Sequence, residues 1–182
     1  MTPPNKLANP KSKLTVRTAE IADAPGISAL SVRTYGEEEM YPEEMIIGQI
    51  NVFPQGQIVA LVDDTVVGYC ATFRIGESVA MKPHTWDEIT GGGWASRHDL
   101  DGEWLYGMEV FVDPEYRGYR IGQRLYNARK RLAQNLQLKD IVFGGRVPTL
   151  YSSIKESGRE QDDAEEVNQR ERHAAVQTVK LT

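Results

Sequence analysis

Three arginines and two glycines in one short stretch could bind an anion. Arg117, Gly118, Arg120, Gly122 and Arg124 are close together in a chain that has few other clusters of this kind. Glycine has no side chain, so backbone N–H groups beside it can approach a phosphate closely. The stretch therefore predicts a phosphate or pyrophosphate site. The alternative is a surface turn with solvated arginines.

A second chemical group lies just before this stretch. Glu109 is a carboxylate within the otherwise apolar run from Trp104 to Val112. Burial in such surroundings would raise its pKa. Gly107 also interrupts the run, and it indicates a β-bulge or a close approach of other atoms to the backbone.

A strand and a helix must position these groups. The run 104–112 is rich in aromatic and β-branched residues and apolar on both faces, which predicts a central strand. Asp113-Pro114 ends it. An apolar stripe at helical spacing predicts a helix over 121–136; its members are Ile121, Leu125, Ala128, Leu132 and Leu136. The arginines then lie at the helix N-terminus, where the dipole favours negative charge and a bound anion.

Nucleotide-binding motifs are the rival interpretation. Asp140 lies about 20 residues beyond the loop, as a dinucleotide fingerprint requires. However, it precedes the next expected strand, 141–147, whereas the ribose lies at the far end of such a strand. The G-x-G-x-x-G pattern and the Walker G-K-[ST] are both absent. A nucleotide-binding reductase therefore remains a third choice.

The segment V-F-V-D-P-E-Y-R-G-Y-R-I-G resembles motif A of the GNAT acyltransferase superfamily, which binds acetyl-CoA. The usual loop is [QR]-x-x-G-x-[GA], and Arg120 stands here at the middle glycine. HTWDEITGGGWASRHDLDGEWLYGMEVFVDPEYRGYRIGQRLYNARKRL and IVFGGRVP are similar to acyltransferase domains that are fused to carbon–nitrogen hydrolase (nitrilase-like) domains. The resemblance covers about residues 14 to 150.

The resemblance implies an α/β (α+β) fold, with a mixed central sheet flanked by helices. It also implies acetyl-CoA as co-substrate, no metal, and direct attack of an amine on the thioester. The residues that would bind CoA are Val110, Phe111, Val112, Arg117, Gly118, Tyr119, Arg120, Ile121 and Gly122. Glu109 matches a position that often supplies the general base, and Tyr151 is the candidate acid.

The domain boundaries follow from composition. Residues 1–13 are expected to be a disordered tail, 14–151 the GNAT domain, and 152–182 a charged, helical segment, with helix over 163–179. Residues 76–102 form an insertion that is either a mobile aromatic lid or a packed surface loop. GNAT domains usually end with two more strands, and none is expected here. The exposed sheet edge would then allow a homodimer.

Composition limits the classes of function. The chain has 182 residues, a net charge of −5 and one cysteine, Cys70. These values argue against nucleic-acid binding and exclude an internal disulfide framework. The histidines and aspartates of 84–101 match no standard metal motif. No membrane span or signal peptide is apparent, so a cytoplasmic protein is expected.

Two functions remain after these exclusions. The first is an N-acyltransferase for a small-molecule or peptide amine, and acidic Glu37, Glu38 and Glu39 would suit a cationic acceptor. The second is a non-catalytic acyl-CoA-binding or regulatory module, with a fused or associated nitrilase-like domain as its partner. Both predict CoA binding, and only the first predicts thiol release that depends on an amine.

Overall fold

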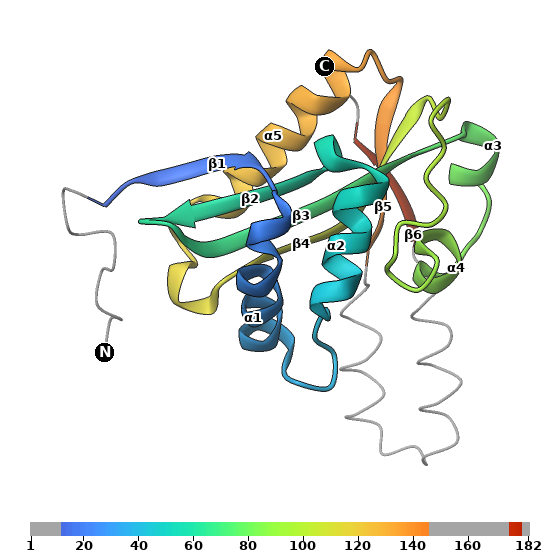
Figure 1. Cartoon of the computed structure of the whole chain (residues 1–182). Coiled ribbons are helices and arrows are strands. Elements are labelled where there is room, and N and C mark those ends of the chain that lie inside the picture. Colours follow the sequence, from blue (N-terminus) through green and yellow to red (C-terminus); the bar gives the residue numbers. More distant parts are fainter. Residues whose placement is uncertain (1–11, 146–174, 180–182) are drawn as a thin grey trace, which may run out of the picture.

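The structure is a computed structural model that describes residues 12–145 and the backbone of residues 175–179. Within this part, one six-stranded sheet has the order β1-β2-β3-β4-β5-β6 (Figure 1). The strands are β1 (Leu14–Thr18), β2 (Gln57–Val62), β3 (Thr65–Ile75), β4 (Trp104–Val112), β5 (Asp140–Gly145) and β6 (Ala175–Val179). All neighbouring strands are antiparallel except β4 and β5, which are parallel.

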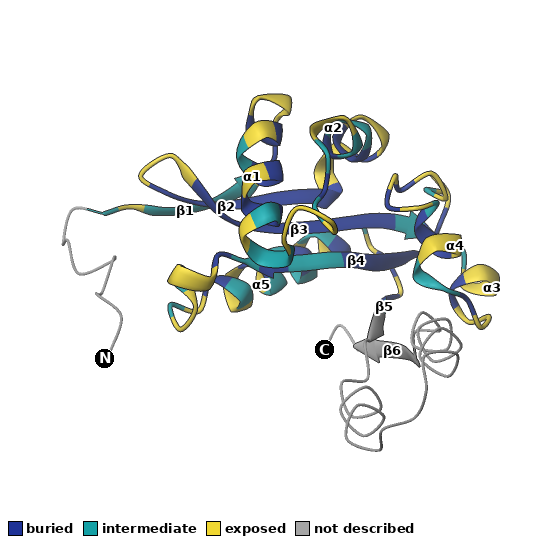
Figure 2. Ribbon diagram, turned by 90° about the horizontal axis from the view of Figure 1, so that it is seen from below, coloured by how far each residue is buried: buried dark blue, intermediate teal, exposed yellow. Residues whose placement is uncertain are grey.

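Helices cover both faces of this sheet (Figure 2). Helices α1 (Ala24–Tyr35) and α2 (Glu43–Val52) pack on one face, over a core that includes Tyr69, Phe73 and Phe111. Helix α5 (Ile121–Asn135) packs on the other face, against Ile58, Val67 and Cys70. Strands β2 and β3 are therefore buried on both sides, as their largely apolar sequences require.

Strand β4 runs farther than its parallel partner β5. The pairing begins at Trp104↔Asp140 and ends at Gly107↔Phe143, whereas β4 continues to Val112. A β-bulge in β4 lies at the same place, because the register with β3 shifts between Ala71 and Thr72. Met108 is the extra residue between Gly107 and Glu109. This part of β4 is therefore irregular on one edge and unpaired with β5 on the other.

The insertion 76–102 packs against the end of the sheet. It contains α3 (Glu77–Ala80) and α4 (Trp86–Thr90). The buried Gln49 side chain donates to the carbonyl oxygen of Gly93 (2.7 Å), and the Trp86 indole N–H donates to the carbonyl oxygen of Met108 (3.1 Å). These bonds correspond to the packed alternative for the insertion, with Trp86 tied to the β4 bulge.

The predicted fold class is confirmed: the sheet is mixed and helices flank it on both faces. Two local predictions were wrong for residues 175–179, which were expected to be the end of a helix over 163–179. They form a strand, β6, which pairs with β5 from Ile141↔Val179 to Gly145↔Ala175, although no strand was expected in this part of the chain. The A-V-Q-T-V segment has the alternation and β-branched content of a strand, and pairing with the free edge of β5 decides its conformation.

Asp23 precedes α1, but its side chain makes no cap hydrogen bond there. Instead, its carboxylate accepts two bonds from Arg17 (2.7 and 2.9 Å) and one from the Glu20 backbone N–H. Burial tends to raise the Asp23 pKa, and these hydrogen bonds outweigh it, so the pKa is lowered. The bonds join β1 to the start of α1.

In residues 12–145 and 175–179, no helix is both long enough and apolar enough to cross a membrane.

Candidate functional site

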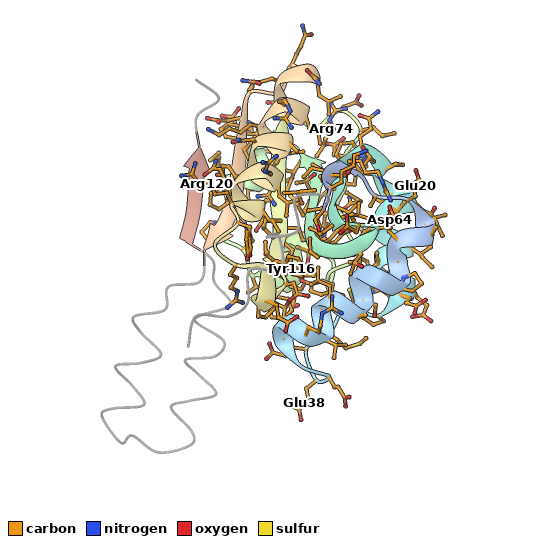
Figure 3. The ribbon with its side chains drawn as sticks, turned by 90° about the vertical axis from the view of Figure 1, so that its left-hand side faces the viewer. Glu20, Glu38, Asp64, Arg74, Tyr116 and Arg120 are labelled. Carbon is orange, nitrogen blue, oxygen red and sulfur yellow. The ribbon has the colours of Figure 1, made fainter. Side chains whose placement is uncertain are left out.

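The loop between β4 and α5, residues 113–120, has a backbone suited to binding an anion and is called the anion loop below. A short 3-10 helix, η3 (Pro114–Tyr116), follows β4 and is capped by the Asp113 side chain, which accepts from Glu115 N–H (2.9 Å). Arg33 of α1 fixes Asp113 with a 2.9 Å ion pair. Gly118 (φ 90°) and Arg120 (φ 59°) then adopt positive φ. Alternation of positive and negative φ directs successive N–H groups into one concavity, as in known anion nests. Figure 3 labels Tyr116 and Arg120 in this loop.

The start of α5 leaves donors available for such an anion. Arg120 is the N-cap residue and its side chain makes no cap hydrogen bond. The first N–H groups of a helix have no partner within the helix. A Cβ at Gly122 would have its nearest neighbour at 3.9 Å, so packing within the described chain does not require glycine there. Close approach of a ligand to the backbone would require a glycine at this position.

The predicted loop residues lie in the order that the motif requires. Arg117, Gly118 and Arg120 are exposed, whereas Ile121 is buried against the sheet and anchors the first turn of α5. The Tyr119 ring lies near the ring of Tyr116, with centroids 6.4 Å apart.

Arg120→Gly is expected to stabilise the protein by about 0.5 to 1 kcal/mol. Left-handed backbone costs a side-chain-bearing residue about 1–2 kcal/mol, and the greater entropy of unfolded glycine offsets part of the gain. Urea unfolding measures the change. Arg117→Gly is the matched control, since its φ of −65° carries no such strain and only destabilisation is expected. An unstabilised Arg120→Gly protein would contradict the strain argument.

Glu109 lies half-buried on the face of the sheet that α1 and α2 cover. One carboxylate oxygen accepts from the Tyr41 hydroxyl (2.9 Å), and the other accepts from the backbone N–H of Val110 (3.0 Å). Tyr41 follows α1 in the loop before α2, and the bond spans 68 positions in sequence. The candidate base is thus held in place by one side chain and one backbone group.

Tyr41 is the partner that the sequence analysis missed. It is 8% exposed, and burial raises the pKa of its hydroxyl well above the usual range, with the negative charge of Glu109 adding to the effect. It therefore stays protonated and donates to the carboxylate. The Y-P step before α2 is a local signal for a turn, but nothing local indicates a contact with Glu109.

Aromatic rings surround this pair. Tyr41 stacks on Phe111 with centroids 5.8 Å apart and meets Trp86 edge-on at 6.5 Å. Tyr35, at the end of α1, lies 5.5 Å from Phe111. Glu109 therefore lies where α1, the loop before α2 and the insertion meet over β4. These rings form apolar walls beside the carboxylate.

The backbone of Val110, Phe111 and Val112 lies on the stretch of β4 beyond its pairing with β5. On the other edge these residues pair with Cys70, Tyr69 and Gly68 of β3. Within the described residues, no β5 residue pairs with them on this edge, and the Val110 N–H donates to the Glu109 carboxylate (3.0 Å). Tyr151, the candidate acid, lies outside the described residues.

Asp140 does not occupy a ribose-binding position. It is the first residue of β5 and pairs with Trp104, the first residue of β4. Its carboxylate accepts from the N–H of Ile141 (3.0 Å). It thus lies at the end of the strands opposite to the anion loop, which removes the one feature that favoured a nucleotide-binding reductase.

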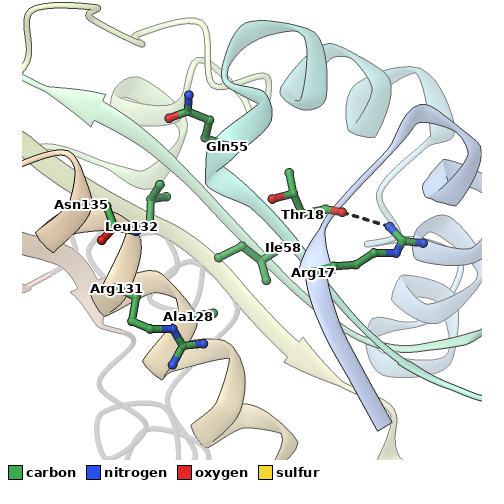
Figure 4. A pocket seen from close by; sticks show the side chains of 8 residues that line it. All are labelled: Arg17, Thr18, Gln55, Ile58, Ala128, Arg131, Leu132 and Asn135. Atoms are coloured by element: carbon green, nitrogen blue, oxygen red, sulfur yellow. Dashed lines mark hydrogen bonds between the residues drawn. The ribbon is translucent and has the colours of Figure 1, made fainter. Parts of the chain in front are cut away.

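Two shallow grooves lie elsewhere, on the side of α5 that faces β1. One, of about 200 Å³, is lined by eight residues shown in Figure 4: Arg17, Thr18, Gln55, Ile58, Ala128, Arg131, Leu132 and Asn135. The other, of about 450 Å³, lies between Val16 and the α5 residues Arg124, Asn127 and Arg131. Neither contains Glu109 or the anion loop. The chemistry is therefore better placed at β4.

No group of three His, Cys, Asp or Glu residues that could hold a metal ion occurs among the described residues. His84, for example, hydrogen-bonds to the carbonyl oxygen of Lys82 (2.7 Å) and to Tyr106 (3.2 Å).

Comparison with known families agrees with this geometry. A model described as the acetyltransferase (GNAT) family matches residues 24–152, which include the β4–α5 loop and Glu109. The chain is also similar to a probable hydrolase, YhcX, of Bacillus subtilis (strain 168), with 36% identity over 146 residues. That match covers 80% of this chain and 28% of YhcX.

Two further matches come from a relative and a solved structure. The uncharacterized N-acetyltransferase YkwB of the same organism is 26% identical over 147 residues, covering 79% of this chain and 65% of YkwB. The GphF GNAT-like decarboxylase in complex with isobutyryl-CoA has a TM-score of 0.68 at 22% identity, covering 82% of this chain and 74% of that one. This chain thus spans less than two thirds of the length of YhcX and less than two thirds of the length of YkwB.

Proposed function

Because the chain belongs to the acetyltransferase (GNAT) family, we propose that it transfers the acyl group of acetyl-CoA to an amine by direct attack in a ternary complex. The amine nitrogen forms a bond to the carbonyl carbon and the carbon–sulfur bond breaks. One proton leaves the ammonium before attack. A second leaves the nitrogen as the amide forms, and the thiolate ends as CoA thiol. This balance needs no oxidant, reductant or metal.

The observation that carries the proposal is the course of β4. Its edge loses β5 after Gly107 and leads directly into the loop with positive φ at Gly118 and Arg120. The backbone of 110–112 would pair with the pantetheine arm, and N–H groups of 118–122 would hold the pyrophosphate. The room at Gly122 fits such a ligand. Acetyl-CoA supplies the activated carbonyl.

Glu109 is proposed as the general base that removes the ammonium proton, directly or through water. It faces the aromatic walls formed by Tyr41 and Trp86, on the side where an acceptor would approach. The Val110 N–H is proposed to stabilise the negative charge that develops on the carbonyl oxygen. Tyr151 is the proposed acid for the leaving sulfur.

Calorimetric titration with acetyl-CoA tests whether residues 117–122 bind the pyrophosphate. We expect binding that weakens by about 10-fold or more in Arg117→Ala combined with Arg120→Ala, because both guanidinium charges would be lost beside the phosphates. Dephospho-CoA retains the pyrophosphate and should still bind, whereas NADH should not. Arg131→Ala, on the β1 side of α5, is the control and should bind normally. A folded protein that does not bind acetyl-CoA would contradict the proposal.

A second function is a non-catalytic acyl-CoA module of a larger carbon–nitrogen hydrolase. The observation that favours it is the 36% identity to a segment that makes up 28% of a probable hydrolase. The departure from motif A at Arg120 is a further reason. Thiol release separates the two functions: an enzyme releases thiol faster when an amine is added, whereas a binding module does not. The nitrilase-like partner domain and a homodimer are proposals of the same kind, to be tested by mass measurement of the purified full-length protein.

A further inference from the structure

Arg129 is a buried cation for which the described chain provides no counter-charge. It is 3% exposed, at a position of α5 where the sequence pattern predicted the apolar stripe to continue through Ala128 and Leu132. Among the described residues, none of the ion pairs involves Arg129, and its Nε atom has no hydrogen-bond partner. Burying a guanidinium without a carboxylate is costly, so a specific role needs to be found for it.

The neighbours of Arg129 do not neutralise its charge. Its guanidinium carbon lies 5.7 Å from the centre of the Tyr126 ring. The Cys70 thiol lies close to it, and burial raises the pKa of that thiol despite the nearby arginine, so Cys70 remains uncharged. The positive charge is thus retained beneath β4, partly stabilised by an aromatic face.

The guanidinium is aimed at the β4 bulge. Its Nη2 donates to the carbonyl oxygen of Glu109 (2.8 Å). A Cβ at Gly107 would lie 2.7 Å from Nη1 and 3.0 Å from the guanidinium carbon, so only glycine at 107 leaves room for this side chain. Gly107 is also the last β4 residue paired with β5. Arg129 therefore lies at the point where the two strands part.

The bond to Glu109 constrains the Val110 N–H as well. The carbonyl of Glu109 and the N–H of Val110 belong to one planar peptide unit and point in opposite directions. Arg129 holds the carbonyl end, while the N–H end donates to the Glu109 carboxylate (3.0 Å). The positively charged guanidinium, bonded to the carbonyl oxygen, polarises the whole peptide unit and makes its N–H a stronger hydrogen-bond donor.

We propose that Arg129 is a positioning residue: it fixes and polarises the Glu109–Val110 peptide so that the Val110 N–H, which donates to the Glu109 carboxylate in the free chain, is shared with the thioester carbonyl oxygen and stabilises the negative charge that develops there. This role rests on the proposed acyl transfer. The positive charge of Arg129 also offsets the repulsion that the Glu109 carboxylate would exert on the negative charge developing on the carbonyl oxygen. The group acts through the peptide and does not itself touch the substrate.

Three variants of the full chain separate charge, hydrogen bonding and fold. Arg129→Gln keeps a donor and loses the charge, and Arg129→Lys keeps the charge on a different shape. Arg131→Gln, two positions along and exposed, is the matched control. Because stabilisation exists mainly in the transition state, we expect Arg129→Gln to lower kcat by about 10- to 100-fold and to change acetyl-CoA affinity less than about threefold. The kcat of Arg129→Lys should lie between those of Arg129→Gln and the wild type, and the kcat of Arg131→Gln should match the wild type.

The amide proton of Val110 provides a readout that does not depend on turnover. In ¹⁵N-labelled protein with acetyl-CoA, a polarised donor should resonate downfield, and Arg129→Gln should move it upfield while Arg131→Gln leaves it in place. A folded Arg129→Gln protein with wild-type kcat and an unchanged Val110 resonance would overturn the proposal. If Arg129→Gln does not fold, the same two readouts on Arg129→Lys decide. If no amine supports turnover, acyl transfer is contradicted, and the resonance alone decides the role of Arg129.

Discussion

Replacing Glu109 by glutamine is expected to lower amine-dependent release of CoA thiol by about 100-fold or more. The amide is close in size to the carboxylate and keeps an oxygen that accepts from the Tyr41 hydroxyl, which the native structure places at 2.9 Å. It cannot take a proton from an ammonium group at neutral pH. The loss should therefore appear in kcat, while the anion loop, in a different part of the chain, continues to bind acetyl-CoA.

The measurement is thiol release across a range of pH with a panel of amines, together with calorimetric titration of acetyl-CoA. In Glu109→Gln only amine that is already neutral in solution can react, so the deficit relative to the wild type should shrink as the pH approaches the pKa of the amine. Asp64→Asn is the control, because it removes one carboxylate at the β2–β3 turn, where the left-handed φ of 67° tolerates asparagine. A Glu109→Gln rate within about threefold of wild type at every pH would exclude Glu109 as the base.

Tyr41 and Glu109 show where reading the sequence stops. Glu109 lies in the strand Trp104–Val112, which was predicted correctly, and Tyr41 lies in the connection before the helix Glu43–Val52. Their contact depends on how α1 and α2 pack over β4. No periodicity records a hydrogen bond across 68 positions. The sequence thus identified the carboxylate and missed the hydroxyl that holds it.

The same distinction explains which elements were predicted with correct bounds. Strand β4 begins and ends as predicted, and helix α5 ends one residue before its predicted end, because turn residues and apolar spacing are local signals. Strand β6 was not predicted, because a short A-V-Q-T-V segment forms a strand only when a neighbouring edge is available. Whether β5 offers such an edge is a property of the completed sheet.

Helix α5 shows a subtler error in reading a pattern. The predicted stripe ran through Ala128 and Leu132. In the structure Leu125, Arg129 and Ala133 are buried, so the buried face is rotated by about one residue. The rotation accommodates a guanidinium under the β4 bulge, in space that Gly107 leaves. A charge in a core position can be recognised only when the bulge that it serves is known.

Gly107→Ala is expected to destabilise the fold by about 2–3 kcal/mol, or roughly 100-fold in the folding equilibrium. The new methyl would lie 2.7 Å from Nη1 of Arg129 and 3.3 Å from the Cβ of Phe143. The guanidinium is buried and bonded to Glu109, and the Cβ of Phe143 is fixed by its own strand, so neither atom can move freely. Urea unfolding measures the loss. Gly122→Ala, whose methyl would meet nothing nearer than 3.9 Å, should be neutral or slightly stabilising.

A double-mutant cycle identifies the atom responsible. In an Arg129→Ala background the methyl at 107 can occupy space that the guanidinium has left, so the double variant should be more stable than the sum of the single changes predicts. We expect a coupling free energy of about 1–2 kcal/mol, which is typical of residues in direct contact. Strictly additive changes would mean that the clash is with Phe143 and the β5 backbone. Glycine at 107 would then be required by the pairing of β4 with β5, and the close fit between Gly107 and Arg129 would not determine the shape of the bulge.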